Sequence, residues 1–127
     1  MSLPYTNSID LLTGTVSESS VGVTTTTTGL GFDVSKRQQI VVQFLVTGHV
    51  SGNTVFSLDG SNDGTHWTTG LACQDLTSVT ETTYVTSKTI SSNTSQAVKV
   101  PSGWRFIRAV ATITTDGTSF AFMEAAG

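Results

Sequence analysis

The sequence predicts an all-β fold: a single-domain antiparallel β-sandwich or jelly roll of about eight strands, with an extended N-terminal arm. Ser and Thr make up about a third of the chain. Thr, like Val, is branched at Cβ, which suits a pleated strand better than a helix. Short apolar or alternating segments recur at roughly 8- to 14-residue intervals, separated by Gly, Pro, Asn and Asp, and no helical periodicity accompanies them.

Length and charge narrow the class of protein. The 127 residues fall in the size range of one domain, and no linker or internal repeat divides them. Only 12% of the residues are charged and 37% are hydrophobic, a balance that argues against disorder. The six Lys and Arg residues are scattered, so we expect no nucleic-acid partner. No apolar run approaches the roughly 20 residues that cross a bilayer, and the start lacks the features of a secretory signal, so we expect no membrane partner.

The first 18 residues differ from the rest of the chain. Pro4, Gly14 and scattered Ser and Thr break any periodicity. Apolar side chains nevertheless occur there, among them Leu3, Tyr5, Ile9, Leu11 and Leu12. Because exposed apolar surface tends to become buried, we expect this arm, residues 1–18, to fold back over its own domain or to lie across a neighbouring subunit. Residues 19–127 then form the sandwich domain.

The first part of that domain carries three predicted strands. The Thr run at 24–28 is strongly β-prone and ends at Gly29. Residues 38–47, QQIVVQFLVT, are almost continuously apolar and predict a central strand covered on both sides for part of its length. A turn containing Gly and Asn follows, and the alternating segment 53–60 predicts the next strand.

Residues 58–67, LDGSNDGTHW, are best interpreted as a turn, because Asp, Asn and Gly are the residues that tight turns select. A short strand is expected around 66–69. Residues 70–81 lack periodicity and indicate a short helix or an irregular crossover.

The second half predicts four further strands, at 82–90, 95–100, 104–114 and 118–125. The segment WRFIRAVATIT at 104–114 alternates most cleanly and carries apolar residues on both faces, which is typical of a central strand. Asp116-Gly117 is typical of a two-residue hairpin turn, so we expect the last two strands to pair directly.

Calcium binding is the alternative to a simple turn at 58–67. Asp59, Ser61 and Asp63 stand at the first, third and fifth positions of a calcium-type loop, with Gly64 at the sixth. The acidic ligand expected at the twelfth position would fall at Gly70. The turn is therefore the preferred interpretation, with a weak calcium site as its alternative, and no other metal or cofactor is predicted.

Catalysis has little support in the sequence. Cys73 is the single cysteine, which excludes an internal disulfide and fits a protein made in a reducing cytosol. His49 and His66 are the two histidines, and no nucleophile motif, HExxH motif or phosphate-cradling glycine loop occurs. We predict no catalytic residues and a protein that is not an enzyme.

Carbohydrate binding by exposed aromatic side chains is a further alternative. Trp67, Trp104 and Tyr84 could stack on sugar rings. A site at the turn would comprise Asn62, Asp63, His66 and Trp67. Each Trp, however, stands at the head of a predicted strand, where a large aromatic ring more often plugs the end of the core.

Two segments resemble a recurring pair in small β-sandwich proteins of tailed-bacteriophage virions. The first, here called the turn motif (residues 55–69), has a strand that leads into a GS-x-DG-x-x-W turn within VFSLDGSNDGTHWTTG. The second, the strand motif (residues 98–124), has a Pro-Gly turn, an aromatic-Ile-Arg strand and a final hairpin within VPSGWRFIRAVATITTDGTSFAF. Discoidin-like domains are similar in part, but they are longer and usually carry a disulfide that one Cys cannot form.

The resemblance implies a structural role. Within the phage group, a short domain with an apolar arm looks like a capsid decoration (cement) protein, which sits on the outside of a phage head, commonly as a trimer, and clamps neighbouring subunits. The implied partners are the major capsid protein and copies of the chain itself. The implied location is the capsid exterior, after synthesis in the host cytoplasm. Leu3, Tyr5, Ile9, Leu11 and Leu12 would then contact other subunits or the capsid. A tail or head-fibre component is the nearest alternative.

Overall fold

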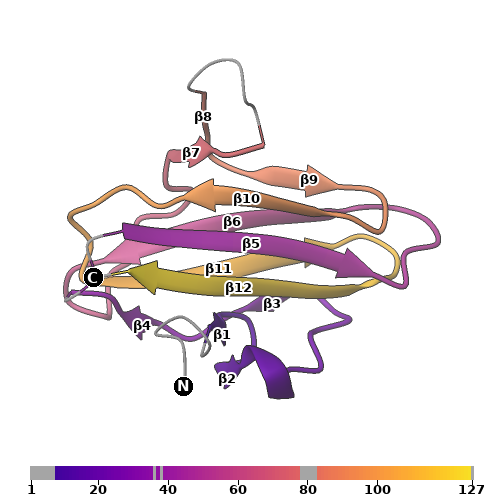
Figure 1. The fold of residues 1–127 in the computed structure, drawn as a ribbon, viewed down its shortest axis with the longest axis horizontal. Coiled ribbons are helices and arrows are strands. Elements are labelled where there is room, and N and C mark those ends of the chain that lie inside the picture. Colours follow the sequence, from indigo (N-terminus) through magenta and orange to yellow (C-terminus); the bar gives the residue numbers. More distant parts are fainter. Residues whose placement is uncertain (1–7, 36, 38, 78–82, 127) are drawn as a thin grey trace.

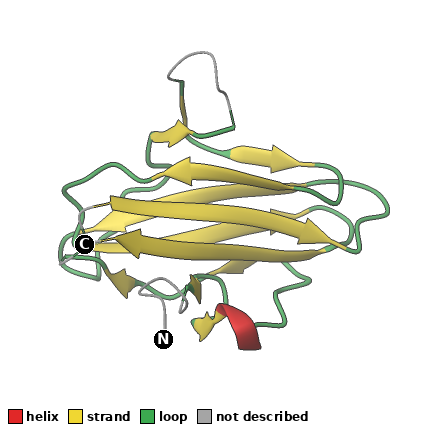
Figure 2. Ribbon diagram, in the orientation of Figure 1, coloured by secondary structure: helices red, strands yellow, loops and turns green. Residues whose placement is uncertain are grey.

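A computed structural model shows two antiparallel β-sheets packed face to face (Figures 1 and 2). It describes residues 8–35, 37, 39–77 and 83–126. Within these residues the strands are β1 (Ile9–Asp10), β2 (Thr15–Val16), β3 (Thr27–Thr28), β4 (Phe32–Asp33), β5 (Gln39–Thr47), β6 (Thr54–Ser61), β7 (Cys73–Asp75), β8 (Tyr84–Val85), β9 (Lys88–Ile90), β10 (Ser95–Lys99), β11 (Phe106–Ile113) and β12 (Thr118–Ala126). One 3-10 turn, η1 (Ser17–Ser19), lies between β2 and β3.

The larger sheet, here called sheet A, has the order β2-β1-β12-β5-β10-β7-β8. The smaller, sheet B, has the order β3-β11-β6-β9, and β4 also pairs with β11. The predicted all-β antiparallel sandwich is therefore confirmed. The strand count exceeds the predicted eight because several pairings of two or three residues at the sheet margins carry too little sequence pattern to be recognised.

The core lies between the inner faces of the two sheets. Phe44 of β5 stacks on Phe56 of β6, with ring centroids 4.7 Å apart. Along β5, buried residues alternate with residues that are partly or fully exposed. The strand is central, as predicted, since it lies between β12 and β10. It is covered on one face only, which corrects the expectation of cover on both sides.

Strand β11 is also central. It pairs with β6 along its whole length and with β3 and β4 on its other side. Its inner face is fully buried and consists of Ile107, Ala109 and Ala111. Its outer face carries Phe106, Arg108 and Val110, which are half-buried. The predicted alternation of 104–114 is thus confirmed, with the smaller residues turned inward.

The expected hairpin at Asp116-Gly117 is wrong. Strand β11 belongs to sheet B and β12 to sheet A, so this turn crosses from one sheet to the other. It packs beside the other crossing at 48–53, where Val50 and Ser51 donate backbone N–H groups to the Asp116 carboxylate at 3.0 and 3.3 Å. These bonds hold the pKa of Asp116 below its ordinary value, and the bond from Val50 has the largest effect.

Two further expectations need correction. Around 66–69 there is only one isolated bridge, between Thr68 and Gly60. The segment 70–81 contains a short strand, β7, and its described part contains no helix; residues 78–81 lie outside the described residues. At the end of β7, Asp75 accepts a hydrogen bond from Lys88 of β9 at 2.8 Å, and both side chains are largely covered. This ion pair joins sheet A to sheet B at one side of the sandwich.

The N-terminal segment folds back over its own domain from Ser8 onward, one of the two expected outcomes. Strand β1 pairs with β12, and the carboxylate of Asp10, fully buried, accepts hydrogen bonds from the backbone N–H groups of Leu12 (3.0 Å) and Ala121 (3.1 Å). The hydroxyl of Ser20 donates a third, at 2.5 Å. Leu11 and Leu12 belong to the core. In the part of the chain that the structure covers, no helix is long and apolar enough to cross a membrane.

Candidate functional site

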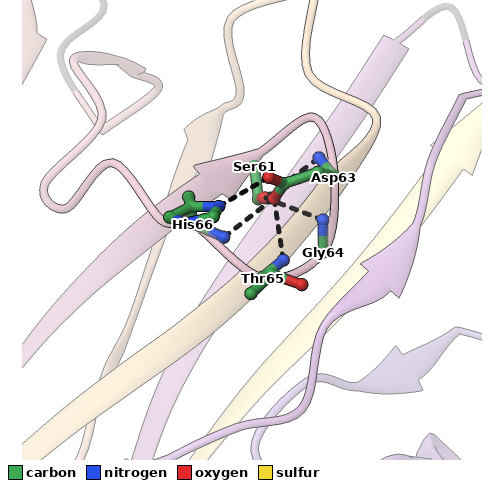
Figure 3. A network of polar contacts seen from close by, with 5 residues as sticks. All are labelled: Ser61, Asp63, Gly64, Thr65 and His66. Carbon is green, nitrogen blue, oxygen red and sulfur yellow. Dashed lines mark hydrogen bonds and ion pairs between the residues drawn. The ribbon is translucent and has the colours of Figure 1, made fainter.

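The turn at residues 61–66 is built by its own polar side chains (Figure 3). One carboxylate oxygen of Asp63 accepts hydrogen bonds from the backbone N–H groups of Thr65 and His66, both at 2.8 Å. The other oxygen lies 2.7 Å from Nδ1 of His66. Ser61 donates its hydroxyl to Asp63 at 3.0 Å and accepts from the N–H of Gly64 at 2.9 Å. Asp63 thus organises the turn.

This arrangement lowers the pKa of the Asp63 carboxyl well below its ordinary range. The largest cause is the backbone N–H of His66, followed by the His66 side chain and the N–H of Thr65, because each stabilises the charged form. Both oxygens are occupied by the protein itself, so the carboxylate serves the turn.

Below the turn, Asp59 and Arg108 form a buried ion pair across β6 and β11. The guanidinium Nε of Arg108 donates to Asp59 at 3.0 Å, and the two residues face each other in the strand register. The Asp59 side chain is 3% exposed and that of Arg108 is 24% exposed. The backbone N–H of Gly70 donates a second hydrogen bond to Asp59, at 3.2 Å. The charge of Asp59 is therefore matched by a cation and a backbone donor.

Trp67 completes this arrangement. The Arg108 guanidinium carbon lies over its ring, 4.3 Å from the centroid, in a cation–π contact. Trp67 also packs on Gly31, where a Cβ would lie 2.7 Å from the ring. Its half-buried ring therefore covers the outer face of sheet B, which corrects the expectation that it plugs the end of the core.

Trp104 does take the expected position at the end of the core. It packs against the buried cluster, and its ring lies so close to Gly60 that a Cβ there would approach it to 2.5 Å. Gly60 is thus required by the close approach of an aromatic ring. The backbone N–H of Arg105, next in the chain, donates to the side-chain oxygen of Asn62 at 3.2 Å.

The calcium alternative finds no support in this geometry. Asp59 is directed to Arg108, and Ser61 and Asp63 bond to the turn. Across residues 8–35, 37, 39–77 and 83–126, no three His, Cys, Asp or Glu side chains gather in a way that could hold a metal ion. The three residues are explained by the turn interpretation.

The alternative glycan residues are brought together only in part. Asn62, Asp63 and His66 are exposed on the turn, but the oxygens of the first two accept backbone hydrogen bonds. Trp67 is half-buried, with Arg108 over its ring. Of the three aromatic candidates, Tyr84 is the one that is widely exposed, at 65%.

The arm residues predicted to contact other subunits differ in where the structure places them. Leu11 and Leu12 are buried in the core of the chain itself, because the segment after β1 turns inward beside β12. These two side chains are therefore not on the surface. Ile9 is partly exposed, while Leu3 and Tyr5 lie outside the described residues.

Cys73 is buried on the inner face of β7. Burial raises the pKa of its thiol to about 11, which keeps it protonated at neutral pH. The protonated thiol fits the structural role that the sequence indicated.

Sequence reasoning missed Arg108 as the residue that joins the turn to β11. The position of Arg108 could have indicated this role, because a charged residue within an otherwise apolar central strand needs a partner of opposite charge.

No family model, curated protein or solved structure matches this chain.

Proposed function

We propose that the protein is a structural virion component, a capsid decoration protein that binds the outside of a phage head and has no enzymatic activity. The observation that carries the proposal is the contact between the two phage-like motifs. Asp59 and Trp67 come from the turn motif and Arg108 from the strand motif, and their side chains form one unit. The contact shows that the two segments that carry the resemblance are neighbours in the fold, which supports the proposal.

In this proposal the protein self-associates, as a homotrimer, and binds the major capsid protein on the capsid exterior. The outer face of β12 supports self-association. Phe120 and Phe122 stack there with centroids 5.2 Å apart and are half-buried, while the smaller Ala121 points into the core. Leu45 of β5 lies opposite Phe120 and extends the apolar area. A second copy that covers these rings would remove apolar surface from water.

The many repeated sites of a capsid make this mode of binding effective. Modest contacts in each copy combine into high avidity when several subunits of one trimer are held at once. Asp10 and the β1 pairing hold the folded-back segment from Ser8 beside β12. The proposed capsid contact would then include Ile9, which is partly exposed, with Leu3 and Tyr5.

Light scattering on the purified full chain tests the self-association, and co-sedimentation with expanded capsids tests the partner. We expect a trimer that sediments with capsids. Phe122→Thr should shift it toward monomer, whereas the matched change Val110→Thr, on the outer face of sheet B, should leave the mass unchanged. A monomeric wild-type protein that stays in the supernatant would overturn the proposal.

A further inference from the structure

A second surface, away from the turn motif, has the composition of a ligand site. An open groove of about 420 Å³ lies on sheet A where β10, β7 and β8 meet. Its volume is within the range of about 300–1,000 Å³ that is usual for small-molecule sites. The residues that matter for its chemistry are Gln39, Gln74, Tyr84, Lys99 and Ser102. Strands β7 and β8 stand at the upper end of Figure 1.

The strand register places three of these side chains, Lys99, Gln74 and Tyr84, in one row. Gln74 lies opposite Lys99 on one side and opposite Tyr84 on the other. Residues that face each other across strands point to the same side of a sheet. Cys73 and Val98, their neighbours in the chain, are buried on the inner face, so the row lies on the outer face.

The polar groups of the groove are available for a ligand. The side chains of Gln39, Gln74 and Lys99 make no hydrogen bond or ion pair with another described residue. The two amides offer both donors and acceptors, and the ammonium group offers three donors. Among the described residues that line the groove, Lys99 is the charged one, and it supplies a cation although the chain carries −3 overall.

We propose that this groove binds an acidic saccharide, one whose sugar rings carry a carboxylate. The exposed ring of Tyr84 provides a flat apolar surface for the C–H face of a sugar. Gln39 and Gln74 match its hydroxyl groups, and Lys99 pairs with the carboxylate in a charge-assisted hydrogen bond. An added peptide strand would use the backbone of the edge strand β8 instead of these side chains on the face of the sheet.

Calorimetric titration of the full-length protein tests the proposal, with an oligogalacturonide as the acidic probe and a maltooligosaccharide of equal length as the neutral one. We expect the acidic probe to bind and its affinity to fall as salt is raised. Tyr84→Ala and Lys99→Met should each weaken it at least tenfold. Both side chains lie on the surface, and circular dichroism and melting curves verify that the variants fold.

His66→Ala is the matched control, because it removes an exposed ring from the alternative glycan site at the turn without touching the groove. Its affinity should equal that of the unaltered protein. Binding that is lost in His66→Ala and kept in Tyr84→Ala would overturn the proposal, as would equal binding of both probes or binding of neither. Capsid binding is measured separately, so the result is independent of the proposed virion role.

Discussion

Two ion pairs, Asp63 with His66 and Asp59 with Arg108, each take their carboxylate from the turn motif, yet they differ in nearly every physical respect. Asp63 and His66 are closer, at 2.7 Å, but are three residues apart in the chain and 54% and 87% exposed. Asp59 and Arg108 are 3.0 Å apart and largely buried, and they join β6 to β11 across 49 residues. Water and salt screen the first pair, whereas the second is shielded by Trp67.

The distance between the charged atoms alone does not show which of the two pairs contributes more to stability. A buried carboxylate that loses its cation retains an uncompensated charge, and an exposed one is simply hydrated. The buried pair therefore contributes to the integrity of the fold, and the exposed pair shapes only the local turn.

The largest expected loss of stability is that of Arg108→Met. We expect the free energy of unfolding to fall by about 3–5 kcal/mol, because Asp59 would keep only the N–H of Gly70 as a partner. Urea denaturation followed by tryptophan fluorescence measures the change.

Two variants control this result. Arg105→Met removes an exposed cation that lies 3.8 Å from Asp33 and should change stability by less than about 0.5 kcal/mol. Asp59→Asn combined with Arg108→Met removes both charges and should recover part of the loss. A double variant as unstable as Arg108→Met alone would show that the buried charge is not the cause.

An intermediate effect is expected at the ion pair between Asp75 and Lys88. Lys88→Met should destabilise the protein by about 1–2 kcal/mol, since a covered, charge-assisted hydrogen bond between the sheets is lost. The Lys88 side chain is the main reason that the pKa of Asp75 lies below its ordinary value.

The sign of the pH dependence follows from that lowered pKa. The contribution of Asp75 is fully present above the unfolded-state pKa of about 4 and is lost as the pH falls toward the lower folded value. Melting curves between neutral and acid pH should therefore converge for wild type and Lys88→Met. Curves that keep a constant separation would contradict this assignment.

The smallest effects belong to the exposed pair. Asp63→Ala should lower the melting temperature less than either change above, because it removes the oxygen that accepts two backbone N–H groups at the surface. Asp63→Asn keeps an oxygen that can accept both N–H groups and should lower the melting temperature less, and His66→Ala should lower it least. If His66→Ala proved more damaging than Asp63→Ala, the side-chain pair and not the backbone bonds would hold the turn.

The sequence predicts the parts of the fold that repeat a pattern over several residues. The near-continuous apolar run of β5 and the alternation in β6 and β11 mark strands of eight or nine residues, and their positions are confirmed. Strands such as β1 and β4 could not be predicted, because two residues show no periodicity. They form because they pair with neighbouring strands. At Asp116-Gly117 the local sequence favours a tight turn, but it contains nothing about which sheet receives the next strand.

The candidate site divides in the same way. The turn could be predicted because Asp63 and Gly64 act on their immediate neighbours. The role of Arg108 could not, since its partner lies far away in the chain and any buried acid would have matched it. The groove at Tyr84 depends on the register of β7, β8 and β10, which only the assembled sheet defines.

The crossing of the chain between the sheets has a consequence for how the protein folds. Strand β5 pairs with β12 along its whole length, so the segment near residue 40 finds this partner only when residues 118–126 are present. Such distant pairings slow folding, because closing a long loop costs chain entropy before the stabilising contacts form. During synthesis one edge of β5 would stay unpaired until β12 has left the ribosome. We therefore expect slow refolding, and a chain shortened by β12 should aggregate instead of forming a smaller sandwich.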